Sequence, residues 1–174
     1  MYDVSMNDTP DIIVIGMGNI LLSDEGVGVR VVERMMESHR FPPNVRLVDG
    51  GTTAMKGLLP LVEQARHLVV VDAVHGPGLP GSLYRYSGAD FRINIPKKIS
   101  AHDIGFLECL AIAEVNEQAP ESVVIIGVKP VDMTTPSMSL SPQIEGMLDD
   151  IIKMVCIELA ALGVELKPEI KSTK

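Results

Sequence analysis

The sequence predicts an α/β protein, a three-layer α/β/α sandwich around a mostly parallel sheet. Two observations favour this class: short, purely apolar segments alternate with helical patterns along the chain, and these segments lack the polar alternation of half-exposed strands. With 174 residues, of which 46% are hydrophobic, the chain has enough length for one domain with a full core. We therefore expect a single domain over residues 1–174, with flexible termini at 1–10 and 167–174.

The first half of the chain contains three predicted strands. Residues 11–16 form an apolar run typical of a buried strand, and Gly16 and Gly18 permit a tight turn after it. Ser23 is placed to cap a helix over 24–38, where apolar residues recur at helical spacing. A short strand, a helical stretch broken by Pro60 and a third, purely apolar strand follow at residues 45–48, 53–65 and 68–71.

The second half contains two predicted strands and two helices. Residues 82–86 alternate like an exposed edge strand, and 123–128 form another apolar strand. Between them, residues 100–117 predict a helix with the capping box Ser100-x-x-Asp103. Ser141 and Pro142 open a long final helix, which we expect to end at Gly163. Its apolar face comprises Ile144, Met147, Leu148, Ile151, Val155, Leu159 and Leu162.

Charge and composition exclude several classes of partner. The net charge of −8 disfavours nucleic acid and anionic membranes, which attract clusters of Lys and Arg. No apolar run reaches the roughly 20 residues that cross a bilayer, and the polar N-terminus is no signal peptide. Cys109 and Cys156 lie in helical patterns without metal-type spacing, which indicates buried thiols in a reducing compartment. We expect a soluble, cytoplasmic protein.

Three residues with metal-binding side chains follow the predicted strands on one edge of the sheet. Glu25 comes after the first strand, Asp72 ends the third, and His102 lies in the first turn of the helix over 100–117. In open α/β sheets ligands bind outside the carboxyl ends of the strands, here between the first and third. A helix N-terminus keeps an imidazole neutral and able to bind metal, and two carboxylates with one imidazole suit nickel, zinc or cobalt. Alone, Asp72 is explained equally well as a turn residue and His102 as a helix-start histidine that bonds to a neighbour. Glu25 alone is explained as an ordinary helix-start carboxylate, and it becomes a ligand candidate only because the other two converge on the same edge.

Two further aspartates at this edge have simpler explanations. Asp24 is typical of a carboxylate stabilised by the dipole at a helix start. Asp49, in Asp49-Gly50-Gly51-Thr52, is typical of a glycine turn with a local acceptor. A dinucleotide motif is incomplete, because Leu21 replaces the third glycine of G-x-G-x-x-G, and no phosphate-binding G-K-[ST] follows.

These motifs together resemble the hydrogenase maturation endopeptidases, the proteases of [NiFe] hydrogenase assembly. The resemblance rests on Gly16-x-Gly18-Asn19-x-Leu21-x-x-Asp24-Glu25-Gly26-x-Gly28, Asp49-Gly50-Gly51-Thr52, Val71-Asp72-Ala73 and Ser100-x-His102, and covers roughly residues 11–165. It implies a five-stranded mixed sheet in the order 2-1-3-5-4 with strand four antiparallel, a position that residues 82–86 fit.

The resemblance also implies a function. Glu25, Asp72 and His102 would contact nickel carried by the substrate, the precursor of a hydrogenase large subunit, and the enzyme would remove its C-terminal extension after a histidine or arginine. Asp49 is our candidate for a further catalytic or positioning carboxylate, in what would be an aspartyl endopeptidase. We expect a monomer with nickel as the recognition element.

Two other functions stay open at this stage. One is a nickel-sensing assembly chaperone that binds the precursor without cutting it. The other is a small nucleotide- or phosphate-binding protein that uses the Gly16 turn and the helix N-terminus.

Overall fold

The sheet has the predicted strand order. The structure, a computed structural model, describes residues 11–53, 55–88 and 101–168, with the backbone alone at 55–56, 101–104 and 167–168. Five strands lie in the order β3-β1-β4-β6-β5. Neighbouring strands pair in parallel except β5, which is antiparallel to β6. Their bounds are β1 Ile12–Met17, β3 Val45–Gly51, β4 His67–Ala73, β5 Leu83–Ser87 and β6 Ser122–Val128.

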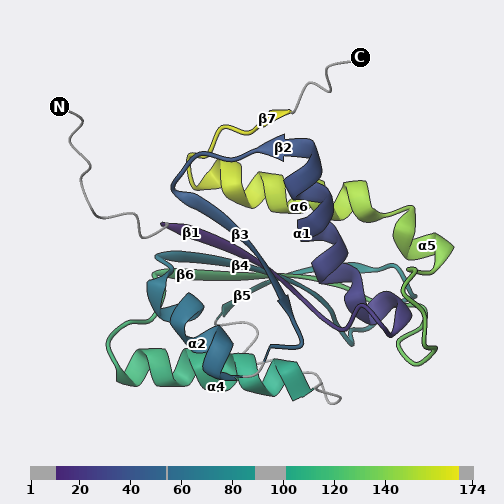
Figure 1. The fold of residues 1–174 in the computed structure, drawn as a ribbon, viewed down its shortest axis with the longest axis horizontal. Coiled ribbons are helices and arrows are strands. Elements are labelled where there is room, and N and C mark those ends of the chain that lie inside the picture. Colours follow the sequence, from purple (N-terminus) through teal and green to yellow (C-terminus); the bar gives the residue numbers. More distant parts are fainter. Residues whose placement is uncertain (1–10, 54, 89–100, 169–174) are drawn as a thin grey trace.

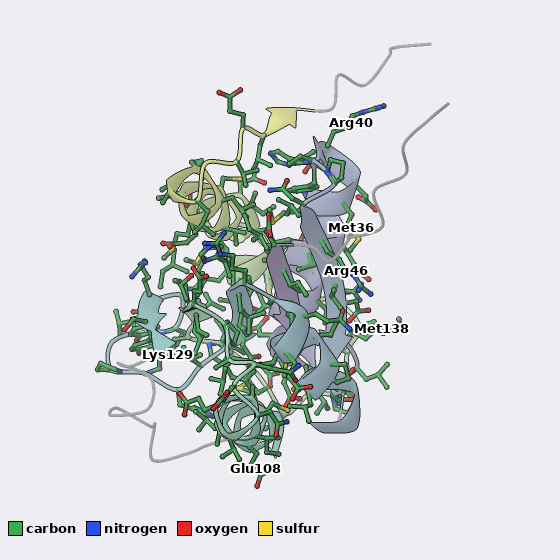
Figure 2. The ribbon with its side chains drawn as sticks, turned by 90° about the vertical axis from the view of Figure 1, so that its left-hand side faces the viewer. Met36, Arg40, Arg46, Glu108, Lys129 and Met138 are labelled. Atoms are coloured by element: carbon green, nitrogen blue, oxygen red, sulfur yellow. The ribbon has the colours of Figure 1, made fainter. Side chains whose placement is uncertain are left out.

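Helices cover both faces of this sheet (Figure 1). Helices α1 (Val27–Ser38) and α6 (Leu148–Ala161) lie on one face, and α2 (Met55–Gln64) and α4 (Ala101–Val115) lie on the other. Figure 2 shows the side chains between these layers, with Glu108 pointing outward from α4. The α/β class and the three-layer arrangement are confirmed.

Alternation along the strands divides the core into two clusters. In β1, Ile12 and Val14 pack with α1 and α6, whereas Ile13 and Ile15 pack with α2 and α4. All six residues of β1 are buried, as its continuous apolar run predicts. Each fully buried aliphatic side chain of this kind contributes about 1.5–3 kcal/mol to folding.

The start of the first helix differs from the prediction. A 3-10 turn, η1 (Ser23–Gly26), precedes α1, and no side chain caps either element. Ser23 has a φ of +51°, a left-handed conformation that costs a non-glycine residue roughly 1–2 kcal/mol. The predicted capping by Ser23 is therefore wrong, because the turn is held by contacts outside the helix.

Two predicted helices differ in their continuity. Helix α2 continues through Pro60, which costs a single backbone hydrogen bond while Leu58 and Val62 on either side are fully buried. The final helix is instead divided into α5 (Pro142–Glu145) and α6, with the break at Gly146 and Met147. Its apolar face continues across the break, which explains why periodicity predicted one helix.

The caps of the final helical segment are confirmed. The Ser141 side chain accepts a bond from Ile144 N, and Pro142 is the first residue of α5. At the end of α6, Gly163 has a φ of +83°, and Gly163 N and Val164 N donate to Ala160 O and Leu159 O. This pair of bonds is the Schellman motif, in which glycine is strongly preferred.

Two residues of the C-terminal segment form a short strand. Lys167–Pro168 forms β7, which pairs antiparallel with β2 (His39–Arg40). Two-residue ladders are too short to show a sequence pattern, and the flexibility of the C-terminal residues stays a prediction. The other predicted flexible residues, 1–10 and 169–174, and Ser100 of the capping box lie outside the described residues.

Cys109 lies in α4 and Cys156 in α6, as their helical patterns predict. Neither Cys109 nor Cys156 forms a disulfide in the part of the chain that the structure describes. Burial raises the pKa of each thiol, which disfavours the nucleophilic thiolate. Over the described ranges, every helix is too short or too polar to cross a membrane.

Candidate functional site

Asp72 lies at the carboxyl edge of the sheet, near the end of β4. It comes one residue after Val71, the last residue of β4 that pairs with β1. Its side chain is buried, at 3% exposure, and its Oδ1 accepts a bond of 2.8 Å from Ala73 N. Because Val70 packs with α2 and α4 and side chains alternate, Asp72 lies on that face of the sheet.

Glu25 lies in η1, which contacts β4. Its side chain is partly buried, and Oε2 is fully buried without a hydrogen-bond partner among the described residues. A buried carboxylate oxygen without a donor is costly, and such groups in native proteins call for an explanation. A ligand that supplies positive charge would provide one.

Two glycines allow the Glu25 turn to approach the sheet. A Cβ at Gly28 would overlap the carbonyl oxygens of Val71 and Met17, so only glycine lets the start of α1 lie against the ends of β1 and β4. Gly18 has a φ of +120°, and a Cβ there would overlap the carbonyl oxygen of Glu25. The glycine motif thus serves close packing that brings Glu25 to the end of the strand carrying Asp72.

His102 lies in the first turn of α4, as the sequence predicts. Helix α4 leads into β6, which is parallel to β4, so the helix starts near the carboxyl edge of the sheet and ends near the amino edge. The backbone therefore places His102 at the same edge as Glu25 and Asp72, whereas its side chain lies outside the described residues. Among the side chains that the structure describes, no three His, Cys, Asp or Glu residues form a metal-binding group.

Asp24 is not the simple helix-start residue that the sequence suggested. Its carboxylate is fully buried and accepts four hydrogen bonds from residues more than 100 positions away. Val131 N and Asp132 N donate to Oδ2 at 2.9 and 3.0 Å. Ser141 donates through its N to Oδ1 at 2.7 Å and through its Oγ to Oδ2 at 2.9 Å.

Backbone hydrogen bonds join the same two segments of the chain. Ser23 N donates to Ser137 O at 2.8 Å, and Ser137 N donates to Leu21 O at 3.0 Å. Asp24 N also donates to Asp132 O at 3.0 Å. Residues 131–141, which we call the tethered loop, are therefore bound along the turn that carries Glu25. Sequence reasoning missed this loop, because no local pattern signals a contact across this separation.

Asp49 lies at the same edge but in a different setting. It is exposed at the end of β3, beside a cleft of about 240 Å3 lined by Gly18, Asn19, Ile20, Leu21, Asp49, Gly51 and Thr52. Gly50 faces Ile15 and Met17 of the α2–α4 cluster, so alternation places Asp49 on the opposite face of the sheet from Asp72. The two positions adjoin through Gly18, which lines the cleft and lies against the Glu25 backbone.

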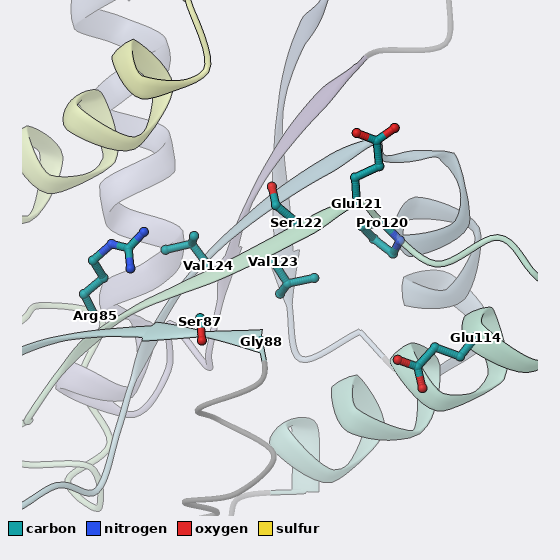
Figure 3. Close-up of a pocket in the computed structure, with 9 residues that line it drawn as sticks. All are labelled: Arg85, Ser87, Gly88, Glu114, Pro120, Glu121, Ser122, Val123 and Val124. Atoms are coloured by element: carbon teal, nitrogen blue, oxygen red, sulfur yellow. The ribbon is translucent and has the colours of Figure 1, made fainter.

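A larger cavity lies at the other edge of the sheet (Figure 3). It has a volume of about 520 Å3 and is bordered by Arg85 and Ser87 of β5, the first residues of β6 and Glu114 of α4. Because β6 begins at this cavity, the cavity lies at the amino edge of the parallel strands, away from the edge where open α/β sheets bind ligands. The Arg85 guanidinium pairs with Glu158 at 2.6 Å. The candidate site is therefore at the Glu25 edge.

Comparison with known proteins defines the class to which this fold and site belong. The family model of the hydrogenase maturation proteases matches residues 29–158, a range that includes Asp49, Asp72 and His102. The chain belongs to this family of peptidases, and the resemblance stated from the sequence is confirmed.

Individual relatives agree with that assignment. The chain is 41% identical over 156 residues to the hydrogenase expression/formation protein HupD of Rhodobacter capsulatus, covering 89% of this chain and 74% of the relative. It is 33% identical to the hydrogenase 2 maturation protease of Escherichia coli, covering 90% and 95%. The solved structure of the hydrogenase maturating endopeptidase HybD from E. coli superposes with a TM-score of 0.86 at 33% identity, covering 92% of this chain and 99% of that one.

Proposed function

We propose that this peptidase removes the C-terminal extension of the nickel-loaded precursor of a [NiFe] hydrogenase large subunit. In this proposal nickel arrives with the substrate and serves as the recognition element. The observation that carries the proposal is the buried, unpartnered Oε2 of Glu25, beside the strand end that holds the buried Asp72. Family membership supplies the reaction class, a hydrogenase maturation protease.

The donor set fits a borderline divalent ion. Glu25 and Asp72 provide carboxylate oxygens, and His102 would add an imidazole nitrogen from the first turn of α4. A buried carboxylate oxygen without a donor gains most when a cation approaches, because the desolvation cost has already been met in folding. A precursor without its metal would leave this cost uncompensated and would bind less well. Cleavage would therefore follow completion of the metal centre.

Asp49 is our candidate for the carboxylate that acts on the scissile peptide. It is exposed, and the cleft beside it adjoins the Glu25 backbone through Gly18. An extended polypeptide that presents its metal to Glu25 would pass along this cleft. There Asp49 would accept a proton from the attacking water as a general base, which defines an aspartyl endopeptidase. We further propose a cytoplasmic monomer that binds neither nucleic acid nor membrane.

Three substitutions test the proposed metal contacts. Glu25→Gln, Asp72→Asn and His102→Gln are each expected to reduce the rate of precursor shortening by about 100-fold or more, because each removes a ligand atom. Glu25→Gln is also expected to leave the melting temperature unchanged or higher, since the carboxylate oxygen it replaces is buried without a donor. Mass spectrometry of the precursor and thermal unfolding measure the two effects. Asp49→Asn is expected to abolish cleavage while the nickel-loaded precursor still binds.

Exposed carboxylates elsewhere supply the control. Asp150→Asn removes a charge of the same kind from the surface of α6, where the residue pairs with Lys153 at 3.0 Å. This variant is expected to process the precursor at the wild-type rate. Full activity of any of the three metal-site variants would remove that residue from the site. Tight binding of precursor by the wild-type protein without any shortening would instead indicate a chaperone.

A further inference from the structure

The carboxylate of Asp24 joins the Glu25 turn to a distant part of the chain. It is 0% exposed, and its four donors all come from the tethered loop, residues 131–141. Three of them are backbone N–H groups and one is a hydroxyl, so the oxygens are satisfied by fixed positions of the loop. Bonds from such donors to a charged acceptor are among the stronger hydrogen bonds in proteins.

These hydrogen bonds hold the η1 turn in a conformation that its own residues would not favour. Ser23, immediately before Asp24, has a φ of +51°, and η1 has no side-chain cap. Left-handed backbone in a non-glycine residue persists when its surroundings determine it, and such residues gather at functional sites. Here the surroundings are the Asp24 bonds and the backbone bonds of Ser23 and Ser137.

The next residue along this turn is Glu25. Its Oε2 is buried without a partner among the described residues, so no described donor fixes the position of that oxygen. The orientation of Glu25 therefore depends on the backbone of η1, which Gly18 approaches from one side and the tethered loop holds from the other. The two adjacent carboxylates thus differ in their contacts: Asp24 binds the tethered loop, and Glu25 holds a buried oxygen without a described partner.

We propose that Asp24 is a positioning residue: its bonds to the tethered loop hold the η1 turn in the shape that presents Glu25 to the metal-loaded substrate. This proposal rests on the proposed function, since it assigns the task for which Glu25 is held. Asp24 itself contacts neither metal nor substrate, because its carboxylate is fully buried and both of its oxygens accept hydrogen bonds from the protein. The loop accordingly forms part of the site's frame.

The test compares Asp24→Asn with two control variants in the full chain. An amide presents a hydrogen donor where the carboxylate presents an acceptor, so at least one of the four bonds is replaced by a donor–donor contact. Asp150→Asn makes the same chemical change on the exposed surface of α6, where Asp150 pairs with Lys153 at 3.0 Å. Val155→Ala removes fully buried volume in α6 and lowers stability away from the turn.

Three readouts separate positioning from general stability. Calorimetry measures the dissociation constant for Ni2+ alone, hydrogen exchange measures protection of the amides of Val131, Asp132 and Ser141, and mass spectrometry measures kcat/KM for the nickel-loaded precursor. For Asp24→Asn we expect Ni2+ affinity and kcat/KM to fall by about tenfold or more, with faster exchange at the three amides. Both controls are expected to keep Ni2+ affinity and kcat/KM near wild type, with Val155→Ala showing only a lower Tm.

Several outcomes would overturn the proposal. Folded Asp24→Asn with wild-type Ni2+ affinity and kcat/KM would show that the residue serves stability alone. Equal losses of affinity in Val155→Ala would do the same. If Asp24→Asn does not fold, Ser141→Ala decides: it removes the hydroxyl that donates to Asp24 Oδ2 and accepts from Ile144 N, and it keeps the three backbone donors. Ni2+ binding weaker than in the stability control Val155→Ala supports positioning, and binding equal to wild type contradicts it. A wild-type protein that neither binds Ni2+ nor shortens the precursor would instead contradict the proposed function.

Discussion

Single residues decide how closely the Glu25 turn approaches the sheet. Gly28 lies where any Cβ would overlap the backbone carbonyl of Val71, the residue before Asp72. Backbone atoms cannot move aside as the end of a flexible side chain can, so a larger residue must displace the whole start of α1. The relative position of Glu25 and Asp72 therefore depends on the absence of a Cβ at Gly28.

Gly28→Ala is expected to lower the free energy of unfolding by about 2 kcal/mol or more and to reduce precursor processing even where the protein stays folded. Gly105→Ala is the matched control, because Gly105 lies within α4 and a Cβ there meets nothing within 4 Å. That change is expected to stabilise the protein by about 0.5–1 kcal/mol. Urea unfolding measures both. A neutral Gly28→Ala variant with full activity would contradict the packing role of this glycine.

The two adjacent acidic residues show how far sequence alone could reach. Glu25 was predicted as a ligand because strand, turn and helix start are local patterns, and because Asp72 and His102 fall at corresponding strand and helix ends. The role of Asp24 was not predictable, since its partners Val131 and Ser141 lie 107 and 117 positions along the chain. The role of Glu25 thus follows from local sequence patterns, whereas the role of Asp24 depends on contacts far along the chain.

At the scale of elements, strands were predicted more accurately than helix ends. The apolar runs that form β1, β4 and the second half of β6 are buried on both faces, so composition alone marks them. The break between α5 and α6 leaves the apolar face intact, and periodicity cannot reveal an interruption that keeps the same residues buried. The pairing of β2 with β7 joins two segments that lie far apart in the sequence, so the local pattern of neither segment could predict it.

The end of α6 gives a test at this scale. Gly163→Ala is expected to cost about 1–2 kcal/mol, because Gly163 has a φ of +83° that an alanine Cβ disfavours. Gly146→Ala serves as the control, since Gly146 has a φ of −66° and is expected to be neutral or stabilised by up to about 1 kcal/mol. Thermal unfolding of both variants provides the comparison. Equal effects of the two substitutions would contradict the assigned Schellman motif.

The tethered loop should also make stability depend on pH. Hydrogen bonds from Thr135 and Thr134 hold the pKa of the Asp132 carboxyl well below its usual range. A carboxyl with a depressed folded-state pKa adds stability above its unfolded pKa of about 4 and loses this contribution as the pH falls further. Asp132→Asn is therefore expected to lower Tm at pH 7, with a difference from wild type that shrinks below about pH 4. A difference that is constant from pH 7 to pH 3 would exclude this contribution.

For the whole molecule, the topology explains why these residues meet. Parallel strands β1 and β4 bring η1 and Asp72 to one edge, and the crossover through α4 returns His102 to that edge. The same sheet was expected from the resemblance to hydrogenase maturation endopeptidases, and the order β3-β1-β4-β6-β5 agrees with it. The metal contacts of this edge stay a proposal that chemistry must test.

The most direct test of the central claim is the shortening of the precursor with and without its metal. Purified protein is incubated with nickel-loaded and nickel-free large-subunit precursor, and the C-terminus is followed by mass spectrometry. We predict loss of the C-terminal extension from the loaded precursor alone, with no shortening of the nickel-free form. Equal cleavage of both forms would contradict recognition through nickel at Glu25, Asp72 and His102.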